Sequence, residues 1–557
     1  MNTNNINTDN INTNNINTDN INTNNINTDN INTNNINTNN INTKAHQQDQ
    51  PWDLVVVGAG IGGLNALHVA TEYLPKDARV LLIDKRQQVG GMWNTTYNHV
   101  HLHQPYQSFT AGNIEWKLGK NPSHLANRFE VLEHLRHCLE VISQRCELHT
   151  MFAADYEGHE EAFDEQGSPM ARVHVNVRGH QFEVSTKRFI KAIGFNAQPQ
   201  EPLALSSDQV RSVTPESWEY MGESMNADSK PIYVVGGGKT GVDAAYEAAK
   251  RYPGRAIHLI AGSGVSFFNR ATTFTTGIKR YTSGTSLLGT IIDLALRYDG
   301  QNEQDVYEHF VKRHGLAFEG IETNNCRFGL LSPEEKRTID EHVQVRKGYL
   351  EDVIETDGGK LVMTFRGGEQ QEIEAGSWIV NCKSTLLQEA LEPEPCLSPN
   401  GAILSITPSA GLLFLTSVSG YLLTHLWMRD KLADAPLWLM DLQKLGRTED
   451  KRNFLVAGSA QITYNVLTVM DRLDLKTMLH CLPTGENWYP TYRILWMFGK
   501  LLVKQRSVLK QLRGALETFE VRHPLRRPVV GEVPALPANS NIPATQHVND
   551  VVTMASA

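Results

Sequence analysis

The sequence has no cysteine pair at the close spacing of a redox or metal motif. Its six cysteines stand alone, without a CxxC or CxxxxC arrangement, at Cys138, Cys146, Cys326, Cys382, Cys396 and Cys481. This spacing excludes the paired thiols of a thiol–disulfide reductase and argues against a disulfide framework or a cysteine-ligated zinc site. We therefore expect no metal. Because no secretory signal precedes the first cysteine, we also expect a reducing, cytoplasmic compartment.

The chain also lacks an uninterrupted apolar run of membrane-spanning length and an excess of positive charge. Its longest apolar stretch, residues 410–428, is broken by glycine, serine, threonine and histidine, and predicts strand, turn and helix. A net charge of -9 gives no electrostatic basis for nucleic-acid binding, so small molecules are the expected ligands. The basic run 498–514 is compatible with a solvated terminal helix or with a peripheral membrane contact, and stable membrane insertion is not expected.

A five-residue repeat occupies residues 1 to 43. Each repeat holds one isoleucine, and asparagine, threonine or aspartate fills nearly every other position. One isoleucine in five buries too little apolar surface to offset the conformational entropy of the chain. We therefore expect this segment to be disordered and to take no part in catalysis.

The remaining chain is long enough for two or three domains. An alternating stretch turns at Arg178 and Gly179 and predicts a hairpin. The apolar segment NFLVAGS, residues 453–459, predicts a late buried strand. Proline-rich, weakly patterned sequence from Pro524 predicts a loose tail.

The first chemical motif follows a predicted buried strand at 53–57. Gly58, Gly60 and Gly63 form GxGxxG at the opening of a predicted helix. The first glycine of this pattern permits a tight turn, the second lets the backbone approach a pyrophosphate, and the third lets helix and strand pack closely. Asp84 ends the next predicted strand, where an acid accepts hydrogen bonds from an adenosine ribose. Together these features predict a dinucleotide site.

A second glycine loop, in the segment YVVGGGKTGVD, admits two readings: a cradle for the phosphates of ATP or for the pyrophosphate of a dinucleotide. The ATP-type loop needs a glycine five positions before Gly238, and Tyr233 stands there. The ATP reading therefore fails. Gly236, Gly238 and Gly241 instead fit GxGxxG, between a predicted strand at 231–235 and a predicted helix at 239–251.

The strand after the second loop indicates which nucleotide it binds. That strand ends in Gly262 and Ser263 and has no acid. A carboxylate here would repel a 2′-phosphate, so its absence permits NADPH. Lys239 or Arg270 would supply the compensating positive charge, and the alternative for each is a solvated surface cation. Two dinucleotide units in one chain imply that one cofactor reduces the other.

A further segment, GGMW, follows the first unit. Gly90 and Gly91 permit close approach of the backbone to a flat ring, and Trp93 can cover an adenosine or flavin edge. The segment HLHQP follows at 101–105. Taken with the two glycine loops and the acid, these residues resemble the class B flavoprotein monooxygenases, which include the flavin-containing and Baeyer–Villiger types. The likeness spans residues 53–459.

The resemblance implies an α/β fold with two Rossmann-like dinucleotide-binding domains of the three-layer ββα type, the NADPH domain inserted into the FAD domain. It also implies that NADPH reduces FAD, and that the reduced flavin captures O₂ as a C4a-(hydro)peroxide and oxygenates a small organic substrate. The expected domains are a disordered repeat at 1–50, an FAD domain in two parts at 51–225 and 346–480, an NADPH domain with a helical insertion at 226–345, a C-terminal helical region at 481–523, and a disordered tail at 524–557.

The catalytic residues are predicted from position alone. His101, His103 and Gln104 follow the flavin-proximal segment and are candidates to contact the isoalloxazine ring or a peroxide. For the histidines, a structural hydrogen bond is the alternative. The family's FxGxxxHxxx(Y/F) fingerprint is absent before the second loop. Two further hypotheses therefore stay open: a flavin reductase or dehydrogenase that does not oxygenate, and a catalytically idle flavoprotein sensor.

Overall fold

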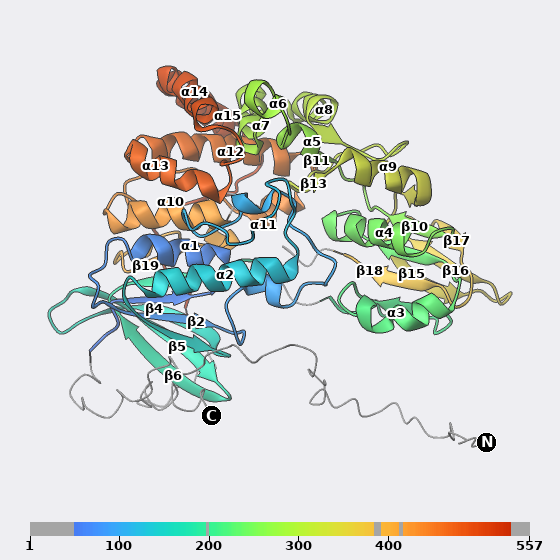
Figure 1. Ribbon diagram of the computed structural model, residues 1–557, viewed down its shortest axis with the longest axis horizontal. Coiled ribbons are helices and arrows are strands. Elements are labelled where there is room, and N and C mark those ends of the chain that lie inside the picture. The colour runs from blue at the N-terminus through green and yellow to red at the C-terminus, as the bar shows by residue number, and fades with distance from the viewer. Residues whose placement is uncertain (1–49, 196–199, 384–391, 411–415, 536–557) are drawn as a thin grey trace. The chain divides into compact units, whose positions relative to one another are not determined.

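The computed structural model describes residues 50–195, 200–383, 392–410 and 416–535. The chain divides into two units, Met1–Gln50 and Pro51–Ala557. The repeat that is predicted to be disordered lies outside the described residues, as does most of the predicted tail. The fold described below is that of the second unit (Figure 1).

The first glycine loop belongs to a five-stranded parallel sheet. In spatial order its strands are β19 (Ile403–Ser405), β7 (Phe189–Lys191), β1 (Leu54–Val57), β2 (Arg79–Asp84) and β3 (Glu147–Phe152). Every neighbouring pair is parallel, and Val55 on the central strand lies opposite both Leu81 and Phe189. Helix α1 (Ile61–Ala70) connects β1 to β2, which confirms the predicted order of strand, glycine turn, helix and strand.

Different layers cover the two faces of this sheet. Leu54 and Val56 pack with α1, α2 (Arg128–Ser143) and α10 (Thr416–Met428). Val55 and Val57, which point the other way, pack on an antiparallel sheet. That sheet consists of β4 (Asp155–Phe163), β5 (Pro169–Val177) and β6 (His180–Thr186), and β5 and β6 form the predicted hairpin. The helices and the antiparallel strands lie on opposite sides in Figure 1, which confirms the three-layer arrangement.

The second glycine loop belongs to another five-stranded parallel sheet of the same design. In spatial order its strands are β14 (Gln344–Arg346), β10 (Ile257–Ile260), β9 (Ile232–Val235), β18 (Trp378–Asn381) and β8 (Arg211–Val213). One face packs on α3 (Trp218–Ala227) and α4 (Lys239–Arg251), and α4 has the bounds predicted from the sequence. The other face packs on the antiparallel strands β15 (Leu350–Glu355), β16 (Leu361–Phe365) and β17 (Gln370–Glu372).

The second sheet extends further along the chain than the predicted boundaries at 225 and 345. β8 precedes the first boundary, and β18 follows the second. These strands find their partners across long sequence separations, so local composition does not reveal which sheet they join. The predicted insertion of one dinucleotide-binding domain into the other is confirmed, because every strand of the second sheet lies between β7 and β19 of the first in the chain.

A helical layer surrounds α12 (Asn453–Met470), which is buried along its length except at its last residue. It packs against α7 (Leu287–Arg297), α8 (Glu303–Arg313) and α15 (Gln505–Arg522). The strand predicted at 453–459 is therefore wrong: this segment is the first two turns of α12. A short apolar run is equally suited to a buried strand or a buried helix, and here the apolar sequence continues for the length of a helix.

Shorter elements complete the unit. The helices are α5 (Arg270–Thr273), α6 (Lys279–Thr282), α9 (Pro333–His342), α11 (Leu442–Arg447), α13 (Leu475–Cys481) and α14 (Thr491–Val503). The strands are β11 (Phe267–Asn269), β12 (Gly315–Leu316), β13 (Leu330–Leu331), β20 (Leu439–Met440) and β21 (Arg526–Arg527). β21 pairs with β20, so the segment predicted as a loose tail from Pro524 begins with a paired strand.

The apolar stretch 410–428 contains α10, as predicted, while the strand predicted ahead of it falls mainly on residues outside the described part of the chain. Among the described helices, none has both the length and the apolar character needed to cross a membrane. Within the basic run 498–514, α15 buries one side, including Val508 and Leu512, in the helical layer. That part of the run is a packed helix with a solvated face.

Candidate functional site

The first glycine of each loop has a backbone conformation that favours glycine. Gly58 has φ +108° and Gly236 has φ +131°. A Cβ on Gly58 would lie 2.3 Å from the carbonyl oxygen of Ala192, and one on Gly236 would lie 2.3 Å from that of Cys382. Ala192 follows β7 and Cys382 follows β18, which are the corresponding strands of the two sheets. Both turns therefore need glycine for the same two reasons: positive φ and a close carbonyl.

The third glycine of each loop sets how closely helix and turn pack. A Cβ on Gly63 would lie 1.8 Å from the carbonyl oxygen of Gly58, and one on Gly241 would lie 1.7 Å from that of Gly236. No side chain fits at either position without moving the backbone. Each helix is thereby held against its own turn, as the sequence pattern predicts.

The middle glycines differ from the others, because the fold does not require them. Gly60 and Gly238 are the N-caps of α1 and α4, and neither helix receives a side-chain hydrogen bond at its cap. A Cβ on Gly238 would meet nothing within 4 Å, and one on Gly60 would lie 3.5 Å from the Cα of Gly91. Backbone N–H groups in the first turn of such a helix are free to bind an anion, and the dipole adds partial positive charge. Both loops thus fit a pyrophosphate.

Asp84 is buried at the end of β2, with 5% of its surface exposed. Its Oδ2 accepts a hydrogen bond from the N–H of Ala59, at 2.7 Å, and its Oδ1 accepts one from the N–H of Arg86, at 2.8 Å. The carboxylate therefore fastens the end of β2 to the first glycine turn. Its predicted contact with a ribose would use the remaining lone pairs of the same two oxygens.

A cavity of about 950 Å³ extends from the segment that contains Trp93 and His103 to the second glycine loop. Seven of the predicted residues line it: Trp93, His101, His103, Gln104, Gly236, Gly238 and Lys239. The other predicted residues are not part of its lining in the described chain: Gly58, Gly60, Gly63, Asp84, Gly91, Gly241 and Arg270. The structure thus brings the candidate catalytic segment and the second loop to one cavity, whereas the glycines of the first loop are not among its lining residues.

The two candidate histidines have different surroundings. Burial, with a contribution from the positive charge of Lys239, lowers the pKa of His103 to about 4. Its backbone carbonyl accepts a hydrogen bond from Nε of Arg270, at 2.9 Å. His101 is exposed, and its Nδ1 lies 3.0 Å from the carbonyl oxygen of His99, to which it can donate a hydrogen bond. His103 is the more enclosed of the two, and its lowered pKa keeps its imidazole neutral at pH 7.

Glu335, which the sequence analysis did not single out, connects the two predicted cations. Its carboxylate lies 3.3 Å from Nζ of Lys239 and 2.8 Å from Nη1 of Arg270. Burial raises the pKa of this carboxyl, but Lys239, Arg270 and the hydrogen bonds from Ser332 outweigh it and lower the pKa to about 2. Lys239 also pairs with Asp243. Neither is a solvated surface cation: the side chains of Lys239 and Arg270 are 12% and 15% exposed, and both pair with carboxylates.

Four other cations that no sequence motif marks line the same cavity: Arg327, Arg366, Lys383 and Arg447. Nη2 of Arg327 donates to the carbonyl of Gly446 at 2.7 Å, while its Nη1 is buried without a hydrogen-bond partner among the described residues. Burial lowers the pKa of Arg327, and burial followed by repulsion from Arg366 lowers that of Lys383. A donor left unpaired in a cavity is costly unless a ligand satisfies it, and these charges favour an anionic ligand.

The sequence of this region matches a known family. Residues 52–270 match the model of the pyridine nucleotide-disulphide oxidoreductase family. The match includes both glycine loops and less than half of the 557-residue chain. None of the six cysteines forms a disulfide, and five of them are buried.

Solved structures similar to the chain include flavin monooxygenases, the class that the sequence motifs resemble. One is the ornithine N-hydroxylase of Kutzneria sp. 744 with reduced FAD, NADP⁺ and L-ornithine: 12% identity, TM-score 0.43, covering 69% of this chain and 100% of that one. Another is a flavin-containing monooxygenase from Stenotrophomonas maltophilia: 13% identity, TM-score 0.40, covering 68% and 97%. The bacillithiol disulfide reductase of Bacillus cereus has 13% identity and TM-score 0.41, covering 68% and 100%. No curated protein sequence matches the chain.

Proposed function

We propose that the protein is an FAD-dependent oxidoreductase that uses NADPH and O₂ to oxygenate a small organic substrate. The observation that supports this most directly is the repeated geometry of the two glycine loops, each at the start of an uncapped helix and each next to the segments that surround one cavity. When bound, FAD would accept a hydride from NADPH and supply the reducing equivalents for O₂.

The first loop would hold FAD. The N–H groups at the start of α1, behind Gly60, would bind its pyrophosphate, and Asp84 would accept hydrogen bonds from the ribose. Gly91 lies against Gly60, since a Cβ on Gly91 would come within 2.9 Å of its Cα. Trp93, on the same short segment, lines the cavity and would cover the edge of the bound cofactor.

The second loop would hold NADPH. Gly238 leaves open space at the start of α4, where the pyrophosphate would bind. The acid-free end of β10 leaves room for a 2′-phosphate, and Arg366 and Lys383 line the same cavity. Lys239 and Arg270 would act at this loop as a pair neutralised by Glu335, which fixes the positions of both cations before the cofactor binds.

His103 and Gln104 would orient the reacting groups and keep water from them. With its pKa near 4, His103 is neutral at pH 7 and can donate one hydrogen bond and accept another. We expect alanine at His103 or Gln104 to raise the fraction of NADPH oxidation that ends in hydrogen peroxide. His101 is exposed, so its alanine variant tests whether the predicted role extends to the cavity mouth. Unchanged coupling in all three variants would remove these residues from the reaction.

The decisive experiment measures NADPH oxidation and oxygen uptake together, with the FAD-loaded protein and a panel of ketones, amines and sulfides. Oxygenation predicts that a substrate speeds both processes equally and appears as an oxygenated product. If the protein binds no flavin when FAD is supplied, the proposal is wrong.

A non-oxygenating reductase is the second candidate. The observation that favours it is the missing fingerprint before the second loop, together with a family match that is not specific to oxygenation. A reductase would oxidise NADPH with an added electron acceptor and yield no oxygenated product. An idle sensor would bind FAD and oxidise NADPH negligibly.

We also propose that the protein is cytoplasmic and that it binds membrane surfaces peripherally through α14. Tyr492, Trp496 and Val503 are exposed there, and Trp496 is 65% exposed with Nζ of Lys500 3.3 Å from its ring centroid. Aromatic and basic side chains on one short helix suit the interface of an anionic bilayer. Trp496→Ser should reduce co-sedimentation with vesicles containing phosphatidylserine. Equal sedimentation of variant and parent would refute the contact.

A further inference from the structure

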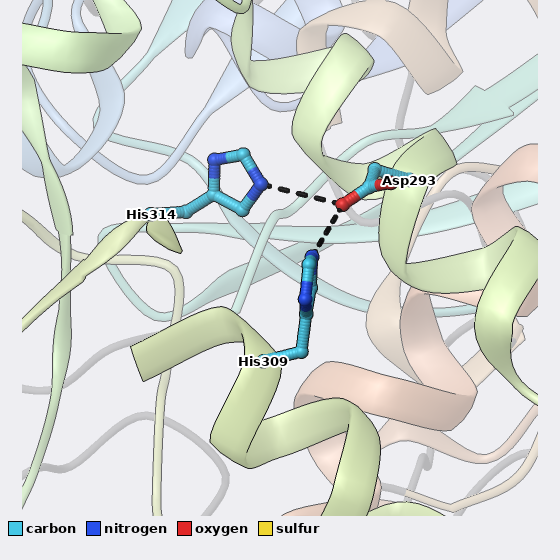
Figure 2. A group of neighbouring side chains, drawn as sticks. All are labelled: Asp293, His309 and His314. Carbon is cyan, nitrogen blue, oxygen red and sulfur yellow. Dashed lines mark hydrogen bonds and ion pairs between the residues drawn. The ribbon is translucent and has the colours of Figure 1, made fainter. Parts of the chain in front are cut away.

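A cluster of two histidines and one aspartate lies in the helical layer. Asp293 is in the middle of α7, His309 is in α8, and His314 follows the last residue of α8. Figure 2 shows both imidazoles turned toward the same carboxylate. Oδ2 of Asp293 lies 2.8 Å from Nε2 of His309 and 3.3 Å from Nε2 of His314.

We propose that Asp293, His309 and His314 form a binding site for a divalent transition metal such as zinc. No metal is expected from the sequence, because no cysteine pair has ligand spacing and because Asp293 reaches His309, 16 positions away, only through the packing of α7 against α8. The three ligand atoms lie within 4.8 Å of one another, and two imidazole nitrogens with one carboxylate oxygen are a ligand set that zinc binds. A small separation of the three side chains would bring each atom to about 2.0–2.2 Å from a central ion.

Each of the three side chains has one atom available to coordinate a metal ion. The other carboxylate oxygen, Oδ1, lies 3.2 Å from Nε of Arg297, so Oδ2 is the oxygen left for a metal. His314 is nearly buried, with 9% of its side chain exposed, whereas His309 is 23% and Asp293 34% exposed. A fourth position is therefore open to water on the exposed side. Hydrogen bonding from the two histidines lowers the pKa of Asp293.

The metal would fasten three pieces of chain that lead to the cavity. It would tie α7 to α8 and to the start of β12. The backbone carbonyl of His314 accepts a hydrogen bond from the N–H of Asn269 at 2.8 Å, and the next residue, Arg270, contacts His103. A metal here would stiffen the wall of the cavity without touching a bound cofactor.

A second group of possible ligands, Glu160, His174 and Glu183, is less suited to a cation. Arg172 lies 3.1 Å from the carboxylate of Glu160 and 3.6 Å from that of Glu183, so it already pairs with both acids. Arg297 meets only one acid of the proposed site, and the acid's other oxygen faces the histidines. The two groups thus provide an internal comparison for the test.

The test measures zinc binding to untagged, chelator-treated full-length protein by titration calorimetry, with bound metal counted by mass spectrometry. We expect one zinc per chain. His309→Gln and His314→Gln should each weaken binding beyond the roughly 10–100-fold that loss of an outer-shell partner costs. Asp293→Asn, which keeps the shape of the side chain, should do the same.

Two control variants distinguish this site from the surface. His342→Gln removes an imidazole that is 60% exposed beside Glu341, and Glu160→Gln disrupts the second group. Both should bind zinc like the parent. Zinc bound equally by the parent and by folded His309→Gln and His314→Gln proteins, or no binding by the parent at millimolar zinc, would overturn the proposal. If His314→Gln fails to fold, the partly exposed His309 decides the result.

Discussion

Replacement of Gly238 by alanine should separate nucleotide binding from folding. The residue has φ -75° and ψ -180°, which alanine adopts without strain, and its Cβ would meet no atom within 4 Å. Reduced chain entropy in the unfolded state would favour the alanine variant by about 0.4–1 kcal/mol. Loss of the N-cap preference for glycine would cost a similar amount, on the order of 0.5–1 kcal/mol. The free energy of unfolding should therefore change little.

Binding should change much more. The new methyl group would point into the open space at the start of α4, where the proposal places the pyrophosphate of NADPH. We expect the NADPH dissociation constant to rise at least about tenfold, equivalent to roughly 1.4 kcal/mol. Equilibrium titration measures this constant, and urea unfolding of the same sample measures stability.

Gly514→Ala supplies the matched control. Gly514 lies in α15, and its Cβ would also meet nothing within 4 Å. In a helix interior alanine should add about 0.5–1 kcal/mol of stability and leave NADPH binding unchanged. If Gly238→Ala binds NADPH as tightly as the parent does, the second loop is not the pyrophosphate cradle and the reasoning fails.

Three other substitutions follow from the same structure. Gly241→Ala should unfold at clearly lower urea than Gly238→Ala, since its Cβ would lie 1.7 Å from a backbone oxygen. Glu335 has a pKa lowered from 4.5 to about 2, so it contributes stability above pH 4.5 that is lost as pH falls toward 2; Glu335→Gln should show a flatter stability profile there. Burial raises the pKa of Glu486 from 4.5 to about 7, so the parent loses stability as pH rises through that range, and Glu486→Gln should not. Unfolding at a series of pH values checks both carboxyl variants, and equal slopes in parent and variant would contradict either assignment.

The glycine loops could be predicted from the sequence because their geometry is local. Gly58 and Gly63 belong to one turn, and the contact that requires glycine at Gly63, 1.8 Å from a Cβ placed there to the carbonyl oxygen of Gly58, is set within that turn. The predicted helix at Lys239–Arg251 is correct for the same reason, since its start is fixed by the loop and its end by the apolar pattern. Steric constraints between residues that are close in the chain can be recognised from the sequence pattern alone.

The charges around the cavity could not be predicted in this way. Glu335 is nearly a hundred positions beyond Lys239, as the separation |i−j| of 96 shows, and reaches it only because α9 packs on α4. The sequence SPEE does contain a sign of the helix start, since Ser332 and Glu335 form a capping box. That pattern predicts a helix but not its partner. Arg327 likewise reaches the cavity through the fold of the helical insertion.

The repeated geometry shows that a glycine pattern also constrains a third segment, which packs against the turn between the strand and the helix. In both sheets the first glycine packs on the carbonyl of a residue that directly follows a neighbouring strand. In the first sheet this residue is Ala192, after β7, and in the second it is Cys382, after β18. The carbonyl would clash with any Cβ at that point. Ala192 and Cys382 therefore constrain how closely the segments 191–195 and 380–383 approach the two loops. A substitution at either first glycine should consequently disturb two strands rather than one.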